Sequence, residues 1–206
     1  MVNHIYYQFG KQPYTVISLP DAEWVFSYSA KKFETELNKH LKGQKLRSVY
    51  IALSGYLDSM YKTADYIDLS CIGGTALIIF EKLVLQLAIH AEGMVEYRIF
   101  PDREVKMEAV FDYPTENALM AGNGYYNLQD HSVPLEYEGK YVESVSVKGT
   151  GLWGGFYLPG FDEEAAELAA QENDLPSEIL FRTETCIIRF EGDCIEYYRL
   201  YFESLK

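Results

Sequence analysis

The clearest periodic pattern in the chain lies between Ser29 and Gly43. Apolar residues recur there at three- and four-residue steps, which is typical of one face of an amphipathic helix. These residues are Ala30, Phe33, Leu37 and Leu41. Ser29 can cap the start, and Gly43 can end the helix in a left-handed conformation. The pattern predicts a helix with His40 at its rim beside Glu36.

The rest of the first half has residue patterns typical of antiparallel strands. These strands are predicted over 46–51, 66–72, 76–80, 83–89, 94–100 and 103–111. Within 83–89 every second residue is large and apolar, whereas Val84, Gln86 and Ala88 form a weaker face. This alternation predicts a sheet that is covered mainly on one side. Residues 5–9 and 14–19 read as a hairpin across Gly10 to Pro13.

The second half predicts a helix over 163–171 that is capped by Asp162, and strands over 178–182, 185–190 and 194–202. A turn is expected at 191–193. Residues 117–130, which contain the Gly122-Asn123-Gly124 run, read as an irregular connection between two units.

A self-comparison at an offset of 96 residues aligns 43–55 with 139–151 and matches four residues: a glycine at each end of the segment, and a serine and a valine between them. A second echo joins 92–99 with 191–200. The expected fold is therefore α+β, mainly antiparallel sheets with two amphipathic helices, arranged as two tandem pseudo-repeated α+β units. The units cover 1–115 and 130–206 and pack into one globule. The alternative is two generic β-meanders.

Composition narrows the functions. The chain has 206 residues, 48% of them hydrophobic, which is ordinary for a folded protein. Its 18 basic and 31 acidic residues give a net charge of −13, which disfavours binding to nucleic acid or to an anionic membrane. A basic protein is the partner that this charge would attract. The start of the chain has no signal-peptide pattern, and three unpaired cysteines suit a cytoplasmic location.

No chemical motif in the sequence points to an enzyme. Residues 149–154 satisfy the GxGxxG spacing, but an extended, Pro-containing segment follows where a nucleotide-binding helix should begin. The four histidines are scattered, and neither metal-ligand spacing nor a GxSxG nucleophile elbow occurs. We therefore expect no metal, no cofactor and no catalytic residue.

The segment 149–161 combines glycines with large rings, which is a common way to build an adaptable contact surface. Its candidate partner-binding residues are Trp153, Phe156, Tyr157 and Phe161. A loop that folds these rings into the core is the alternative.

The sequence thus favours a non-catalytic cytoplasmic protein-binding factor, of the inhibitor or immunity type, that uses an acidic surface rich in the 18 tyrosines. Two alternatives stay open as well. One is a small-molecule or glycan-binding module that uses the loop 149–161, and the other is an enzyme whose site is assembled from distant residues.

Overall fold

The computed structural model describes residues 5–7, 14–27, 29–52, 60–62, 66–68, 75–89, 95–111, 124–127, 137–149, 174, 176–193 and 197–205. The helix expected over 163–171 lies outside these residues. In the part of the chain that is described, the fold is mixed, with antiparallel sheets and a single α-helix.

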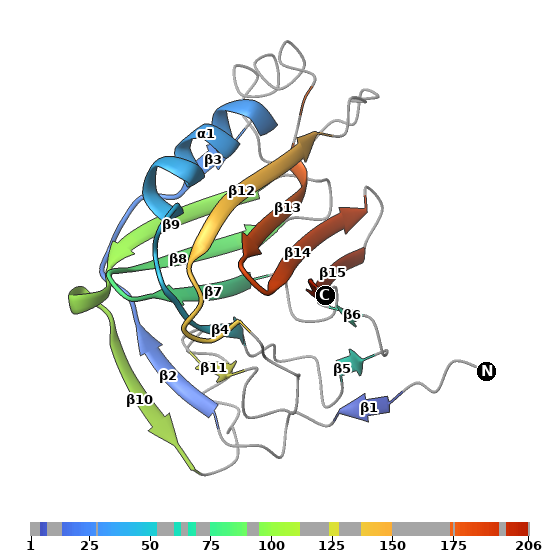
Figure 1. The fold of residues 1–206 in the computed structure, drawn as a ribbon. Helices are drawn as coiled ribbons and strands as arrows, with labels where there is room; N and C mark the ends of the chain where they lie inside the picture. The colour runs from blue at the N-terminus through green and yellow to red at the C-terminus, as the bar shows by residue number, and fades with distance from the viewer. Residues whose placement is uncertain are drawn as a thin grey trace, which may run out of the picture.

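Two antiparallel sheets make up most of the part of the chain that the structure describes (Figure 1). Sheet A has the strand order β1 (Ile5–Tyr7), β5 (Met60–Lys62), β6 (Tyr66–Asp68), β15 (Tyr197–Ser204), β14 (Cys186–Asp193), β13 (Pro176–Thr183) and β12 (Val142–Gly149). Sheet B has the order β10 (Lys106–Val110), β2 (Tyr14–Ser18), β11 (Gly124–Asn127), β4 (Leu46–Ala52), β7 (Thr75–Phe80), β8 (Leu83–Ile89), β9 (Val95–Pro101) and β3 (Val25–Ser27). A short 3-10 helix over Asp102–Glu104 separates β9 from β10.

Helix α1 spans Ala30–Leu41, which confirms the periodic pattern. The Ser29 side chain accepts a hydrogen bond from the Lys32 amide, and Gly43 follows the helix with a φ of 79°. The four predicted apolar residues are all buried, and His40 Nε2 lies 2.7 Å from Glu36 Oε1.

Several expected chain reversals differ in the structure. The prediction of an N-terminal hairpin is wrong, because β1 pairs with β5 in sheet A, whereas β2 pairs with β10 and β11 in sheet B. The segment 117–130 contains a strand, β11, that lies between β2 and β4. Residues 191–193 belong to β14 and form no turn. Turn-forming residues show where a chain can reverse, but they do not choose the partner of a strand.

Four consecutive strands of sheet B and four of sheet A form two antiparallel meanders with the same register. We call β4-β7-β8-β9 the first meander and β12-β13-β14-β15 the second. Corresponding opposed pairs are Ser48–Ile79 and Ser144–Arg182, Ile78–Leu85 and Phe181–Ile188, and Leu83–Pro101 and Cys186–Ser204. Residue numbers therefore differ by 96 in the first strands and by 103 in the other three. Both first strands have a register shift at their second residue, Arg47 and Glu143.

The segments that lead into the two meanders are bonded to each other reciprocally. We call residues 43–46 and 139–142 the clasp. Its four backbone hydrogen bonds run from Gly43 N to Val142 O, from Gly139 N to Leu46 O, from Leu46 N to Lys140 O and from Val142 N to Gln44 O, at 2.8 to 3.0 Å. Gly43 and Gly139 both have positive φ angles, 79° and 74°. Each bond thus has a counterpart 96 residues away on the other side.

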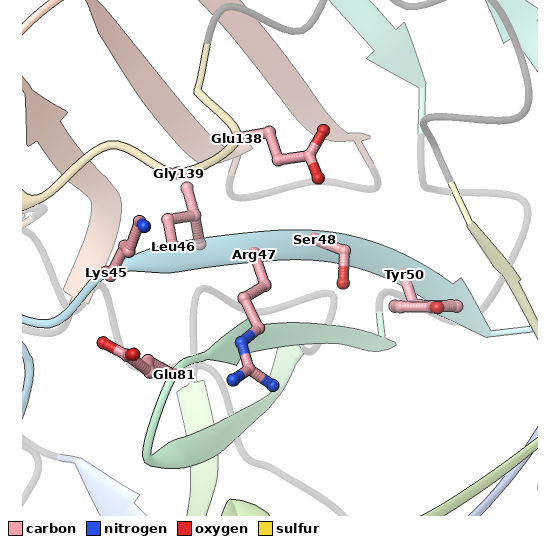
Figure 2. A pocket seen from close by; sticks show the side chains of 8 residues that line it. All are labelled: Lys45, Leu46, Arg47, Ser48, Tyr50, Glu81, Glu138 and Gly139. Atoms are coloured by element: carbon pink, nitrogen blue, oxygen red, sulfur yellow. The ribbon is translucent and has the colours of Figure 1, made fainter.

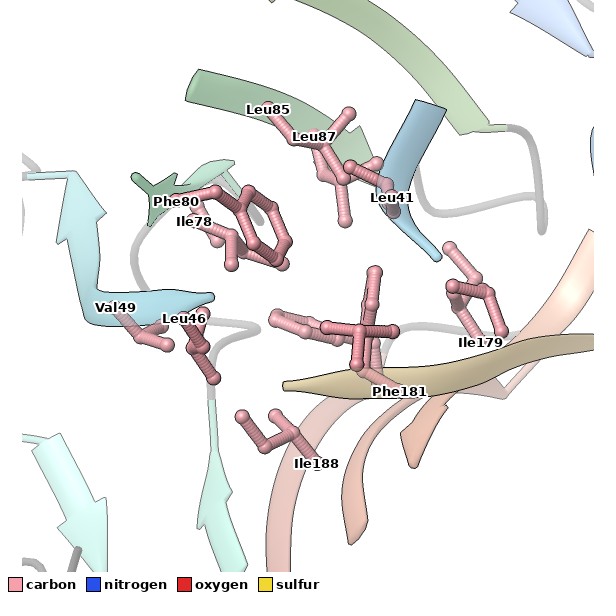
Figure 3. Close-up of a cluster of buried hydrophobic side chains, with 14 of the residues drawn as sticks. Leu41, Leu46, Val49, Ile78, Phe80, Leu85, Leu87, Ile179, Phe181 and Ile188 are labelled. Carbon is pink, nitrogen blue, oxygen red and sulfur yellow. The ribbon is translucent and has the colours of Figure 1, made fainter. Parts of the chain in front are cut away.

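The main core lies between the meanders and includes buried side chains from both, together with those of α1 (Figure 3). Phe80 and Leu85 belong to the first meander, and Phe181 and Ile188 to the second. Cys186 lies in this core and forms no disulfide bond, whereas Cys71 and Cys194 lie outside the described residues. Apolar side chains from both meanders therefore enclose one shared core.

The expectation that the sheet around β8 is covered on one side is wrong. Val84, Gln86 and Ala88 are only 0%, 4% and 7% exposed, so both faces of this strand are buried. The second face belongs to another apolar cluster, which consists of Ile17, Tyr50, Leu77, Ile79, Val84, Phe100 and Tyr125. A central strand buried on both faces can still carry small or polar residues where a partner satisfies them.

No helix among the described residues is both long enough and apolar enough to cross a membrane.

Candidate functional site

The face of the second meander that points away from the shared core carries charged and half-buried side chains. We call it the open face. Among the side chains that the structure describes, it consists of Glu143, Ser144, Ser146, Lys148, Glu178, Leu180, Arg182, Ile187, Arg189, Glu191, Tyr201 and Glu203. Strand alternation explains it, because every second residue of β13 and β14 is buried in the shared core.

Arg189 occupies the centre of the open face. It lies opposite Leu180 on one neighbouring strand and opposite Tyr201 on the other. The guanidinium carbon stands 3.8 Å from the centre of the Tyr201 ring, a cation–π contact. Nη2 lies 2.7 Å from a Glu203 carboxylate oxygen, and Nη1 lies 3.3 Å from one of Glu191. These contacts hold the side chain flat against the sheet.

Two more ion pairs flank this centre. Lys148 Nζ lies 2.8 Å from Glu178 Oε2, and Arg182 Nε lies 3.5 Å from Glu143 Oε2. Among the side chains of this face that the structure describes, four carboxylates accompany three cations, and each of these cations has a carboxylate neighbour. The Glu143 and Glu203 side chains are 50% and 45% exposed, so their charge acts on the solvent side.

The corresponding face of the first meander is closed. Gln86 stands at the position of Arg189, and its Oε1 accepts hydrogen bonds from Arg98 Nε and Nη2 at 2.9 and 2.6 Å. The Arg98 guanidinium carbon lies 4.1 Å from the centre of the Trp24 ring, and Nη1 donates to the Ala22 carbonyl oxygen. The arginine thus closes over a buried amide here, instead of lying on an open sheet.

A second surface feature is a wide groove of about 410 Å³ beside the N-terminal half of β4 (Figure 2). Its lining residues are Lys45, Leu46, Arg47, Ser48, Tyr50, Glu81, Glu138 and Gly139. Arg47 Nη1 lies 3.6 Å from Asp102 Oδ2. The groove presents two cations and two carboxylates, so it suits polar contacts with either charge, and no histidine or cysteine lines it.

Ionisable chemistry elsewhere in the described residues is modest. Among these residues, no three histidine, cysteine, aspartate or glutamate side chains converge as metal ligands would. The hydrogen bond from His40 holds the pKa of Glu36 below its ordinary value of 4.5. Burial raises the pKa of the Tyr97 and Tyr125 phenols. These shifts have structural causes, a helix-surface pair and buried rings.

The residues predicted to bind a partner, Trp153, Phe156, Tyr157 and Phe161, lie outside the described residues. Sequence reasoning missed Arg189 and Tyr201. The available signal was the alternation of Ile187, Arg189 and Glu191 along one strand, which indicates a polar outer face. Only the strand register shows that Tyr201 lies beside Arg189.

Comparisons of the chain with protein-family models, with curated proteins and with solved structures found no match. The open face is the feature that most resembles an interaction surface, because rigid strands display aromatic, apolar and charged groups together.

Proposed function

We propose that the protein is a non-catalytic binding factor that holds a basic partner protein on its open face. The observation that carries this proposal is the Arg189–Tyr201 centre, half-buried and ringed by carboxylates. Arginine and tyrosine are enriched where protein interfaces gain most of their binding energy. Side chains displayed on paired strands are also held in place by the backbone ladder, which reduces the conformational freedom lost when a partner docks.

Charge supports a basic partner. The whole chain has a net charge of −13, which would speed the approach of a positively charged protein. At contact, the exposed Glu143 and Glu203 carboxylates can pair with lysine or arginine side chains of that partner. Lys148, Arg182 and Arg189 already have carboxylate neighbours, so these three cations oppose this attraction only weakly.

The test is affinity capture with the immobilised full-length protein in lysate of its source cells, followed by mass spectrometry. The test variant carries Glu143→Lys and Glu203→Lys, two exposed positions on the open face. The matched control carries Glu23→Lys and Glu104→Lys, which changes net charge equally at exposed positions elsewhere. Capture is then repeated with the purified partner at several salt concentrations.

A basic protein should bind the wild type and the control, and bind the open-face variant about tenfold more weakly or worse. Added salt should weaken its capture. Equal losses in both variants would indicate general charge attraction and would contradict a specific site. A partner that is insensitive to the open-face changes would contradict it as well.

We also propose that the two meanders belong to tandem pseudo-repeated units, within 1–115 and 130–206. Support comes from the equal registers, the shared register shift and the reciprocal clasp. The clasp offers a test. A Cβ at Gly43 or Gly139 would meet no heavy atom closer than 3.6 Å, so an alanine at either position is destabilising only because of the positive φ angle. Each substitution is expected to lower the free energy of unfolding by a similar amount, about 1 kcal/mol. Clearly unequal costs in denaturant titrations would contradict equivalent roles.

A further inference from the structure

Strand β10 forms one end of sheet B. It pairs with β2 along its full length, Lys106 opposite Ser18 through Val110 opposite Tyr14. No other described strand pairs with its second edge. An edge of this kind presents backbone N–H and C=O groups in the geometry that another strand can extend.

The side chains of β10 differ from those of an ordinary covered strand. Residues 106–109 are all exposed, and Met107 is 41% exposed. Phe111, just beyond the strand, is 84% exposed, the highest value among the large exposed apolar residues of the described part. Apolar groups at the end and middle of an open edge favour a partner strand over bulk water.

The other ends of the sheets are less accessible or much shorter. Helix α1 covers the edge of β12: the Asn38 amide donates to Val145 O at 2.6 Å and accepts from Val145 N at 2.9 Å. Glu34 Oε2 accepts from Val147 N at 2.8 Å. The end strands β1 and β3 have three residues each, against five in β10.

Charge along β10 makes the strand complementary to itself. Lys106 and Glu108 flank Met107 symmetrically, so a second β10 running antiparallel about Met107 sets each lysine opposite a glutamate. The two methionines then face each other. Residues 103–110 hold two basic and two acidic side chains and are neutral, in a chain with a net charge of −13. Two copies that meet at this neutral segment therefore repel each other less than the net charge of the whole chain would suggest.

We propose that two copies of this chain associate through β10, antiparallel about Met107, and join their eight-stranded sheets into one continuous sheet. Each interface then contains two Lys106–Glu108 pairs related by the two-fold axis. Opposite charges directly across an antiparallel ladder stabilise it, and like charges destabilise it. The proposal concerns a surface apart from the open face and does not depend on the partner proposed above.

Sedimentation equilibrium of the full chain over a wide concentration range measures the association. The wild type is expected to form a reversible dimer. Lys106→Glu and Glu108→Lys each place like charges at both pairs, so each should weaken the dimer by about tenfold. These changes shift the net charge in opposite directions, so a general charge effect cannot weaken both.

The decisive measurement mixes the two variants. In a mixed dimer both cross-strand pairs are again lysine with glutamate, so the heterodimer should form more tightly than either homodimer. The controls Lys82→Glu and Glu184→Lys carry the same charge changes on exposed hairpin turns and should dimerise like the wild type. A wild type that stays monomeric overturns the proposal. So does a dimer that ignores both β10 variants, or a mixture that shows no preference for the heterodimer.

Discussion

The two meanders share their strand register but differ on the face turned away from the core. Leu77 in the first meander is fully buried, whereas Leu180, at the same place in the second, is half-buried. Gln86 is closed in by Arg98, while Arg189 lies on the open face beside Tyr201. Backbone pairing therefore fixes which positions correspond, and the neighbouring segments determine how deeply each side chain is buried and what it contacts.

The edges of the two first strands differ in the same way. In sheet B, β11 pairs with β4 and supplies a strand to its edge. In sheet A, the corresponding edge of β12 receives side-chain hydrogen bonds from Asn38 and Glu34 of α1. A helix can thus do for one meander what a strand does for the other, because an amide side chain carries the same donor and acceptor as a peptide group.

The sharpest way to break the equivalence of the faces is to truncate the matched leucines. Leu77→Ala is expected to lower the free energy of unfolding by about 2–5 kcal/mol, because it leaves a cavity in a closed cluster. Leu180→Ala is expected to cost about 1 kcal/mol or less, because solvent reaches that site. Urea titrations measure both, and equal losses would contradict the difference in burial.

The next largest effect tests the helix that covers β12. Asn38→Ala removes both partners of the Val145 peptide groups and is expected to cost about 2 kcal/mol of unfolding free energy. Amide hydrogen exchange at Val145 should accelerate with it. Thr35→Ala, an exposed change on the same helix, is the control and should stay within about 0.5 kcal/mol of the wild type. If Val145 exchange does not change in the Asn38 variant, the side chain does not protect this edge.

Arg98 of the first meander and Arg189 of the second test the same difference between the closed and the open face. Arg98→Met leaves the buried Gln86 oxygen without its guanidinium donor and is expected to cost about 1–2 kcal/mol. Arg189→Met removes partly exposed ion pairs and is expected to cost about 0.5 kcal/mol. In thermal melts, Arg98→Met should lower the melting temperature more than Arg189→Met does. The reverse order would contradict the assignment of the closed face to the first meander.

The smallest effect concerns the pH dependence of α1. The His40 hydrogen bond lowers the pKa of Glu36 in the folded protein. The ionised Glu36 carboxylate therefore stabilises the folded state fully above pH 4.5, and this stabilisation is lost as the pH falls through the lowered pKa. Glu36→Gln should therefore reduce stability by a few tenths of a kcal/mol near neutral pH and flatten the decline in acid. Unfolding titrations between neutral and acid pH test this, and parallel curves for both proteins would contradict it.

Local patterns predicted the local elements well. The helix bounds, its cap and the strand Leu83–Ile89 follow from spacing and from residues that act on their immediate neighbours. The offset of 96 also identified the pair of segments that turned out to form the clasp. The echo of 92–99 in 191–200 was less accurate, because the ladders match Tyr97 with Leu200 and so differ by 103 residues.

Long-range pairing could not be predicted in this way. Strand β11 begins at Gly124, within a glycine-rich run that suggests a loop, yet tertiary contacts place it between β2 and β4. The open face was hidden for the same reason, since Arg189 and Tyr201 become neighbours only through strand register. A sequence pattern shows which side of a strand is polar, but not which strand lies beside it.

The clasp has a consequence for how the chain folds. Its bonds join positions 93 to 99 residues apart, whereas the β7–β8 and β13–β14 hairpins close across only two residues each. Closing the long loop costs more chain entropy, so the hairpins can form before the clasp does. If the clasp forms after the rate-limiting step, its bonds mainly slow unfolding. The reciprocal hydrogen bonds would thus set the lifetime of the native state rather than the speed of reaching it.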